Sequence, residues 1–143
     1  MSRRIISIVA IMLAPLLPGL ASAADPGCLD YEPALVTLTG TITRHMEYGA
    51  PGFGEDPVHD EKEVYWYLDL DTPICVNGGS DDSFDEEESG IQRLQIVYGR
   101  YPRGRGWIGH RVSIAGTLFH AENGHHHTKV LIQATKTEKL SAR

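Results

Sequence analysis

Apolar and polar positions alternate over residues 36–43, where valine, leucine, glycine and isoleucine interchange with four threonines. A period of two is the pattern of a β-strand with one buried face. Four further segments are rich in branched and aromatic residues, as strands are. They span residues 64–76, 91–98, 111–121 and 128–138. Because no segment has a sustained helical stripe, the pattern predicts an all-β domain of five strands.

Two of these strands share one pattern. Residues 36–42 match residues 112–118 at a constant offset of 76 positions, with Gly40 and Gly116 at equivalent places. A glycine inside a strand costs stability, so its repetition indicates a bend or a close backbone approach where a sheet closes. With a turn or short helix within residues 101–108, the five strands predict an OB-like barrel. A small β-sandwich is the alternative.

Two long connections interrupt the predicted strands. Residues 47–63 are rich in glycine and proline, and residues 77–90 are strongly acidic with almost no apolar side chain. Neither can bury much surface, so we expect both to be mobile. Asp81 and Asp85 have the spacing of alternating calcium ligands, but Glu86 stands where a calcium loop needs glycine. A solvated acidic loop is therefore favoured.

The N-terminal region has the features of a cleavable secretory signal. Arg3 and Arg4 precede an apolar stretch, and residues 21–23, Ala-Ser-Ala, have the small-x-small pattern that signal peptidase recognises. The stretch is too short and too interrupted by proline for a membrane anchor. We therefore expect residues 1–23 to be removed. Residues 24–143 should then form a single exported domain, periplasmic or secreted, that does not span the membrane.

Charge narrows the choice of partners. The chain has 13 basic and 19 acidic residues. Without the two signal arginines the balance is 11 against 19, a net charge of −8 with neutral histidines. This negative charge opposes binding to nucleic acid and to anionic membrane. We expect a monomer whose partner is an envelope protein, a glycan or a small ligand.

Cys28 and Cys75 are the two cysteines of the chain, and both lie in the exported part. Export would place them in an oxidising compartment, so they predict one disulfide. Closing a loop of 47 positions would stabilise the fold by about 4 kcal/mol through its effect on the unfolded chain. A redox or metal-thiolate pair is the alternative, but it lacks a CxxC spacing and neighbouring ligands.

Four histidines surround one predicted turn and form the candidate metal cluster of the sequence. They are His120, His125, His126 and His127. A two-residue turn would place His120 opposite His127, and a three-residue bulged turn would place it opposite His126. The apolar pattern favours the bulged turn, with His120 and His126 at the barrel mouth and the other two on the outside. Such imidazoles would bind Zn²⁺ or Cu²⁺, and hydrogen bonding within an exposed hairpin is the alternative role.

Several segments together resemble one protein family. They are residues 28–33 leading into 36–41, residues 66–71 with 73–75, and residues 116–121 with 124–128. The chain resembles the small exported bacterial proteins grouped as domain of unknown function 4431, and the resemblance covers most of the mature chain. It implies an envelope setting and assigns no catalytic residue.

The sequence also contains no recognisable nucleophile elbow, paired catalytic carboxylates or phosphate-binding glycine loop. We therefore expect no enzyme and assign no catalytic residue. The favoured function is a non-enzymatic binding module of the envelope, because loops on a rigid barrel commonly carry such contacts. Its predicted ligand contacts are His120, His126, Trp66 and Tyr67. A metal-binding or metal-sensing envelope protein built on the histidine hairpin is the alternative, with Zn²⁺ or Cu²⁺ as the ion and no other cofactor.

Overall fold

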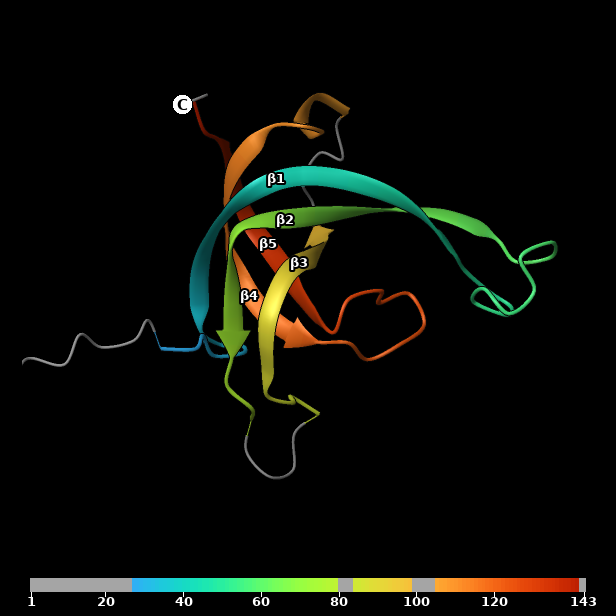
Figure 1. Ribbon diagram of the computed structural model, residues 1–143, viewed down its shortest axis with the longest axis horizontal. Helices are drawn as coiled ribbons and strands as arrows, with labels where there is room; N and C mark the ends of the chain where they lie inside the picture. The colour runs from blue at the N-terminus through green and yellow to red at the C-terminus, as the bar shows by residue number, and fades with distance from the viewer. Residues whose placement is uncertain (1–26, 80–83, 99–104, 142–143) are drawn as a thin grey trace, which may run out of the picture.

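The computed structural model describes residues 27–79, 84–98 and 105–141. Within them, five strands close into a barrel in the order β1-β2-β3-β5-β4 (Figure 1). The elements are β1 (Leu35–Tyr48), β2 (Lys62–Val76), β3 (Glu88–Tyr98), the 3-10 turn η1 (Arg105–Trp107), β4 (Arg111–His120) and β5 (Val130–Lys139). β3 and β5 run parallel, and the other neighbouring strands are antiparallel. The predicted all-β, OB-like barrel is confirmed, and its closure excludes the sandwich alternative.

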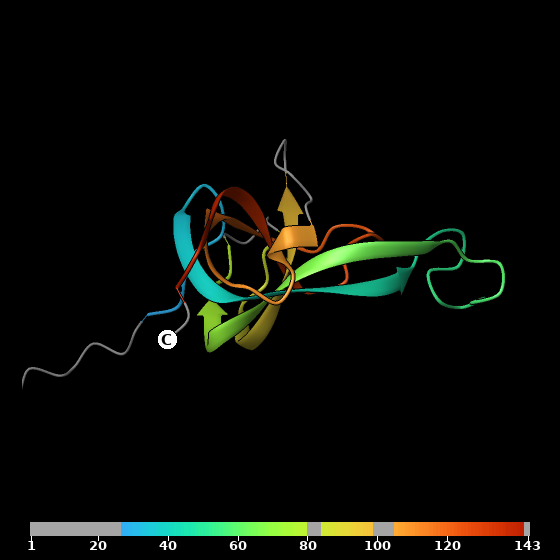
Figure 2. The ribbon, with the colours of Figure 1, turned by 90° about the horizontal axis from the view of Figure 1, so that it is seen from above.

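The first two strands extend beyond the barrel as a two-stranded arm (Figures 1 and 2). Their last pair is Tyr48↔Lys62, so the connection spans residues 49–61 and is shorter than predicted. The sequence pattern fades here because the arm has no core to face. Met46 and Val64, which continue the core-facing positions, are 47% and 53% exposed.

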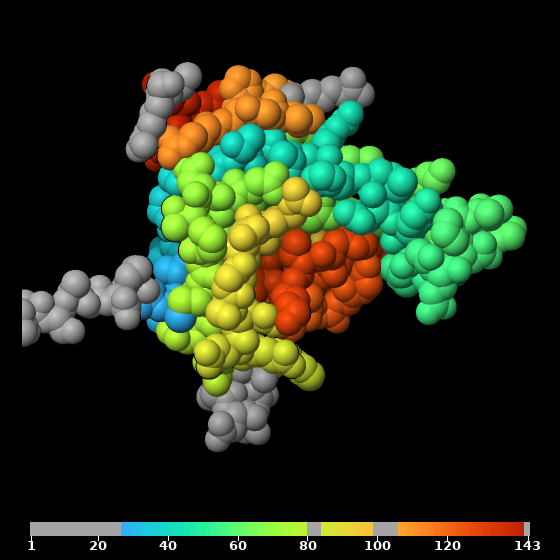
Figure 3. Space-filling model, viewed as in Figure 1, coloured from blue at the N-terminus to red at the C-terminus, as the bar shows by residue number. Residues whose placement is uncertain are grey.

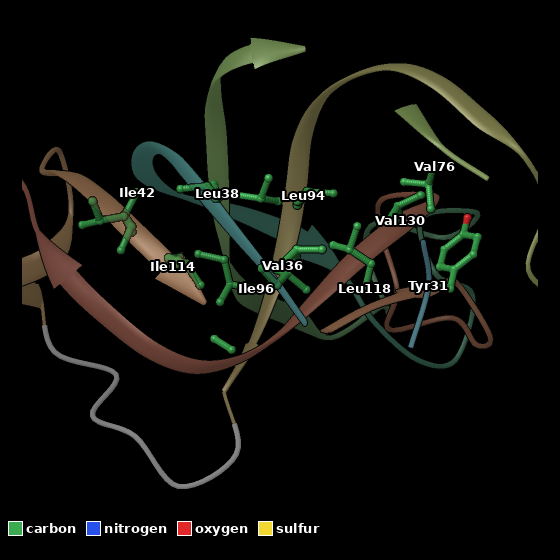
Figure 4. Packing of buried hydrophobic residues seen from close by; sticks show 14 residues of the cluster. Tyr31, Val36, Leu38, Ile42, Val76, Leu94, Ile96, Ile114, Leu118 and Val130 are labelled. Atoms are coloured by element: carbon green, nitrogen blue, oxygen red, sulfur yellow. The ribbon is translucent and has the colours of Figure 1, made fainter. Parts of the chain in front are cut away.

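Inward-facing side chains form one apolar core. On β1 they occupy every second position, as the alternation in the sequence predicts. In Figure 4 the core runs from Ile42 at one end to Tyr31 and Val76 at the other. Trp107 of η1 packs against this core, close to Ile42, whose carbonyl accepts the amide of Gly109 at 2.8 Å. Burying each large apolar side chain stabilises the fold by about 1.5–3 kcal/mol.

Gly40 and Gly116 lie where a neighbouring backbone approaches closely. β1 pairs with β4 up to Thr41 and with β2 from Gly40 onward, and the β4–β5 register shifts at Gly116. A Cβ at Gly40 would lie 2.2 Å from the carbonyl oxygen of Asp69, and one at Gly116 would lie 2.2 Å from that of Gln133. No side chain fits at these distances. The close approach predicted from the repeated glycine is therefore confirmed.

The segment before β1 is fastened to the far end of β2. Cys28 and Cys75 form the predicted disulfide, with their Cα atoms 4.6 Å apart. The amide of Leu29 donates to the carbonyl of Cys75 at 2.8 Å. These links place Tyr31 over the core, where it is buried and its hydroxyl donates to the carbonyl of Glu86 at 2.8 Å. The disulfide thus closes the barrel end at which β2 and β4 finish and β3 begins.

The predicted signal, residues 1–23, lies outside the described residues, so cleavage stays a prediction, as does the division of the chain at residue 24. In the parts of the chain that the structure describes, no helix has the length and apolar character needed to cross a membrane.

Candidate functional site

The outward side of the β1–β2 arm carries a row of polar and aromatic side chains. Residues paired across two strands point to the same side of a sheet, so the alternation that buries the core also gathers this row. The pairs are Thr43↔Tyr67, His45↔Tyr65 and Glu47↔Glu63. We call these six residues the outer face.

Tyr67, a predicted ligand contact, is the buried member of the outer face. It is 2% exposed, and its hydroxyl donates to the Glu47 carboxylate at 2.9 Å. The ring of His45 lies 5.3 Å away, and the guanidinium of Arg93 lies 5.6 Å above the Tyr67 ring. Burial, aided by Glu47, raises the pKa of the Tyr67 hydroxyl above its ordinary range. Tyr67 therefore positions Glu47 and His45, and it presents almost no surface of its own.

The loop of residues 49–61 is organised by the buried carboxylate of Asp60. This carboxylate accepts three backbone N–H groups, two at 2.7 Å and one at 3.2 Å. The donors are Gly52, Gly54 and Asp56. Burial alone would raise the pKa of Asp60, but these hydrogen bonds outweigh it and lower the pKa. The loop therefore has more internal structure than its glycine and proline content indicates.

The loop of residues 121–129 is anchored to β3 by one buried amide. Gln95 is 2% exposed, donates from Nε2 to the carbonyl of His125 at 2.9 Å, and accepts the amide of His127 at 2.6 Å. Its backbone N–H donates to the Thr128 hydroxyl at 2.9 Å. A buried amide that satisfies several partners fixes their conformation. The imidazoles of His125 and His127 are therefore placed by β3.

The two loops meet above the outer face. The ring of Phe53 lies edge-on to that of His125, with centroids 5.7 Å apart. Phe53 has a φ of 51°, a left-handed conformation that is costly for an aromatic residue, and a Cβ at Gly124 would lie 2.7 Å from its ring. The His127 ring packs on Tyr65 at 4.7 Å. Figure 3 shows the surfaces of the arm tip and the orange-red loop side by side. We call this contact the loop clamp, defined by Phe53, Tyr65, Gly124, His125 and His127.

Tyr65, Glu63 and His125 share a hydrogen-bonded cluster under the clamp. The Tyr65 hydroxyl donates to the Glu63 carboxylate, which also lies 3.0 Å from Nδ1 of His125. Hydrogen bonds from Tyr65 and His125 lower the pKa of Glu63. Burial, followed by the bond to Glu63, raises the pKa of Tyr65 above its ordinary range. Glu63 is therefore ionised and Tyr65 neutral at neutral pH, and the cluster presents fixed donors and acceptors.

A pocket of about 140 Å³ opens beside the clamp, where β2 and β3 separate. The β2–β3 ladder reaches the pair Tyr67↔Gln95, and beyond it β3 pairs with β5. Residues 64–66 form one wall and residues 95–98 the other. Trp66, a predicted ligand contact, lies in the first wall and is half-buried against the core. Tyr65 belongs to both the pocket and the clamp.

The predicted register of the histidine hairpin is wrong. His120 pairs with Val130, so it lies opposite neither His126 nor His127, and Ile132 pairs with Leu118 instead of Ile114. The connection between β4 and β5 spans residues 121–129, whereas the sequence predicted a turn of two or three residues. The physical cause is the parallel pairing of β5 with β3 and the anchoring of the loop by Gln95, which local alternation along one hairpin does not reveal.

The structure distributes the four histidines over three places. His125 and His127 belong to the clamp, and His120 lies at the disulfide end of the barrel. His126 accepts the amide of Glu122 on Nδ1 at 2.9 Å and packs against Phe119 with centroids 5.4 Å apart. Burial lowers the pKa of His126. His126 therefore forms hydrogen bonds within the connection between β4 and β5, which is the role that the sequence analysis gave as the alternative to metal binding.

His120 faces a carboxylate at the barrel end. Its Nε2 atom is buried, has no hydrogen-bond partner, and lies 3.9 Å from Oε1 of Glu88. Glu86 joins them, and one ligand atom from each of the three lies within 4.8 Å of the others. Lys129 donates to both oxygens of Glu88, at 2.8 and 3.1 Å. Among the described residues, His120, Glu86 and Glu88 are the group of three side chains whose ligand atoms lie close enough together to hold one metal ion. Two of these three ligands are therefore glutamates and not histidines.

Sequence reasoning missed several of these residues. Gln95 has one signal, since it is a polar residue inside the apolar run of β3. Asp60 stands in a loop of turn-forming residues, where aspartate commonly accepts backbone N–H groups. Glu86 and Glu88 carry no signal that separates them from the other acids of residues 77–90.

Residues 93–138 match the family model described as Domain of unknown function (DUF4431). The matched segment runs from β3 through β4 into β5 and contains Gln95, His120 and the loop of residues 121–129. The resemblance stated from the sequence is therefore confirmed over this segment. No curated protein matches the chain.

Proposed function

We propose that the protein is a monomeric, non-enzymatic binding module of the cell envelope. Its ligand would be rich in hydroxyl groups, such as a glycan fragment, and would bind in the pocket between β2 and β3. The observation that carries this proposal is the loop clamp, in which the connections before β2 and after β4 meet beside that pocket. The Cys28–Cys75 disulfide is compatible with export to an oxidising compartment.

The position of the pocket supports a binding role. OB-like barrels use the face of their second and third strands, flanked by the first and fourth connections, to hold oligosaccharides and oligonucleotides. Here the same two connections are held in place by Asp60 and Gln95. Loops that are ordered before the ligand arrives lose less entropy on binding. The net negative charge of the chain favours a sugar over a nucleic acid.

The chemistry of the walls supports a hydroxyl-rich ligand. Tyr65, Trp66 and Tyr98 offer aromatic surface, and Val64 adds an exposed apolar side chain at the rim. The carboxylate of Glu63 is an ionised acceptor beside them. Sugar rings have apolar faces, which can pack on the aromatic walls, and hydroxyl groups, which can donate to the Glu63 carboxylate.

The pKa values argue against catalysis in the clamp. A general acid or base works best with a pKa near the working pH. The pKa of Tyr65 is raised and that of Glu63 is lowered, so both move away from neutrality. These two groups therefore suit hydrogen bonding to a ligand rather than proton transfer.

A titration of the oxidised, ¹⁵N-labelled mature domain with chitotriose, an N-acetylglucosamine oligomer, would test the proposal. We expect amide shifts concentrated at residues 64–66 and 95–98. Val64→Lys should fill the rim and weaken binding at least about tenfold, since it blocks a small pocket. Val58→Lys is the matched control, because Val58 is 85% exposed and lies outside the pocket walls. Absence of shifts at millimolar chitotriose, or binding unaffected by Val64→Lys, would overturn the proposal.

A further inference from the structure

Three potential metal ligands converge at the disulfide end of the barrel, away from the proposed ligand pocket. His120 is the last residue of β4 and Glu88 the first of β3, and Figure 1 shows these strand ends at the same end of the barrel. The carbonyl of Glu86 is fixed by the Tyr31 hydroxyl at 2.8 Å. The side chains of His120 and Glu88 are only 16% and 12% exposed. The barrel therefore holds two ligands on strands and a third on a tethered segment.

The hydrogen bonding of His120 leaves an acceptor without a donor. Its Nδ1 lies 3.2 Å from the carbonyl of Ala121. A proton on Nδ1, donated to that carbonyl, gives Nε2 a lone pair directed at the Glu88 carboxylate, which also accepts. At 3.9 Å the two atoms are too far apart for a hydrogen bond, and Nε2 is buried from water. Two acceptors that face each other in a shielded place call for a cation between them.

Lys129 now supplies positive charge to one side of this arrangement. Its Nζ atom bonds both oxygens of Glu88, but the lysine side chain is 72% exposed and projects from a loop. Although Glu88 is only 12% exposed, the Lys129 end of this ion pair lies in solvent, where the ammonium is well hydrated without its partner. The lysine can therefore swing into solvent when another cation takes its place.

We propose that His120, Glu88 and Glu86 bind one divalent transition-metal ion, Zn²⁺ in preference to Ca²⁺, with a fourth position open to water. An imidazole with two carboxylates suits Zn²⁺, whereas Ca²⁺ prefers six or more oxygen ligands. The hydrogen bond from Nδ1 to Ala121 is the kind of outer contact that orients a metal-bound histidine. The ligand atoms lie within 4.8 Å of one another, and the exposed Glu86 side chain is free to move inward. This site differs from the four-histidine cluster predicted from the sequence.

Isothermal titration of the tag-free, oxidised mature domain with Zn²⁺ alone would test this site. We expect one ion per chain at micromolar metal, and binding at least about tenfold weaker in Glu88→Gln and in His120→Ala. His126→Ala is the matched control and should bind as the wild type does. Lys129→Ala should bind Zn²⁺ roughly two- to fivefold more tightly, because it removes the competing cation.

The Lys129 variant keeps the test decisive if His120→Ala proves unstable, because it alters no buried group. Imidazole ¹⁵N spectra provide a second readout, in which Zn²⁺ should shift Nε2 of His120 and leave the His126 resonances in place. Failure to bind Zn²⁺ at 1:1 stoichiometry, equal binding by Glu88→Gln, or shifts confined to residues 125–127 would overturn the site. Chitotriose binding is a separate measurement, so failure here leaves the glycan proposal intact.

Discussion

The loop clamp and the disulfide end of the barrel both combine a histidine with a glutamate, yet their hydrogen bonding differs. In the clamp, the Glu63 carboxylate meets the Tyr65 hydroxyl and lies 3.0 Å from Nδ1 of His125. At the disulfide end, the Glu88 carboxylate faces an Nε2 atom of His120 that has no partner. Glu63, Tyr65 and His125 satisfy one another, although Nε2 of the neighbouring His127 is also buried without a hydrogen-bond partner. At the disulfide end, the unpaired Nε2 faces a carboxylate across 3.9 Å, and this pairing of two acceptors is what lacks a cation. Residue type alone does not separate these cases, because the difference lies in which atoms face each other.

Removal of the disulfide should produce the largest loss of stability, and it should affect the disulfide end of the barrel more than the loop clamp. Cys28→Ala combined with Cys75→Ala opens a loop of 47 positions and should lower the free energy of unfolding by about 4 kcal/mol. Urea unfolding would measure this loss. Hydrogen exchange should accelerate most at Leu29, whose amide bonds to the carbonyl of Cys75. It should accelerate least at Gly52, whose amide bonds to Asp60 in the loop of residues 49–61. Equal acceleration at both amides would contradict the separation of the two regions.

Gly40→Ala should damage the frame that carries both regions. The new Cβ would lie 2.2 Å from the carbonyl oxygen of Asp69, so strands β1 and β2 must move apart. We expect a loss of about 3 kcal/mol in the free energy of unfolding. Gly106→Ala is the control, because a Cβ there meets no atom within 4 Å, and it should change stability by less than about 0.5 kcal/mol. Similar urea midpoints for the two variants would rule out close approach at Gly40.

Acid should weaken the barrel next to the outer face through Asp69. Burial would raise the pKa of Asp69, but hydrogen bonds from Arg93 at 2.5 Å and Thr43 at 3.0 Å outweigh it and lower the pKa. A carboxyl with a lowered pKa in the folded state stabilises the fold above its unfolded value of 3.8, and this stabilisation is lost as pH falls through the folded pKa. Because the side chain of Asp69 is 34% exposed, its contribution to the free energy of unfolding should be below about 1 kcal/mol.

Asp69→Asn tests this assignment. The variant should lose the Asp69 contribution at pH 7 and show a smaller further decrease on acidification than the wild type. Urea unfolding at pH 7 and below the unfolded pKa would compare the two proteins. Identical pH dependence in both would show that Asp69 does not contribute.

Gly124→Ala should have the smallest effect on stability and act on the clamp alone. Its Cβ would lie 2.7 Å from the Phe53 ring, which can rotate away because it belongs to an exposed side chain on a loop. The free energy of unfolding should change by less than about 0.5 kcal/mol. Nuclear Overhauser contacts between the rings of Phe53 and His125 should disappear. Their persistence in the variant would show that the two loops do not depend on a glycine at this position.

The barrel was largely predictable from the sequence, because its determinants are periodic. Alternation over residues 36–43 marks the buried side of β1, and the repeated Gly40 and Gly116 mark the close approaches. The disulfide followed from the presence of two cysteines in a chain that the sequence predicts to be exported. These features act locally or in a single pair, so one sequence is enough to recognise them.

The candidate sites were predictable only in part. Trp66 does line a pocket and His120 does lie among potential metal ligands, but their partners come from strands distant in the chain. Pairing of β5 with β3 and the buried contacts of Gln95 decide where the histidines lie. Such contacts form only when the barrel closes and brings β3 next to β5, so the spacing of residues 120–127 alone does not predict them. For the same reason Glu88 could not be distinguished from its acidic neighbours.

The division of β1 between two ladders has a consequence for detecting ligands. Residues 35–41 pair with β4, and residues 40–48 pair with β2, first within the barrel and then along the arm. Because one continuous strand serves both, the arm and the barrel should melt as one cooperative unit. By thermodynamic linkage, a compound that binds only the folded arm should raise the melting temperature of the whole domain. A simple thermal-shift screen of soluble envelope fragments therefore becomes an assay for occupancy of a site that lies outside the hydrophobic core.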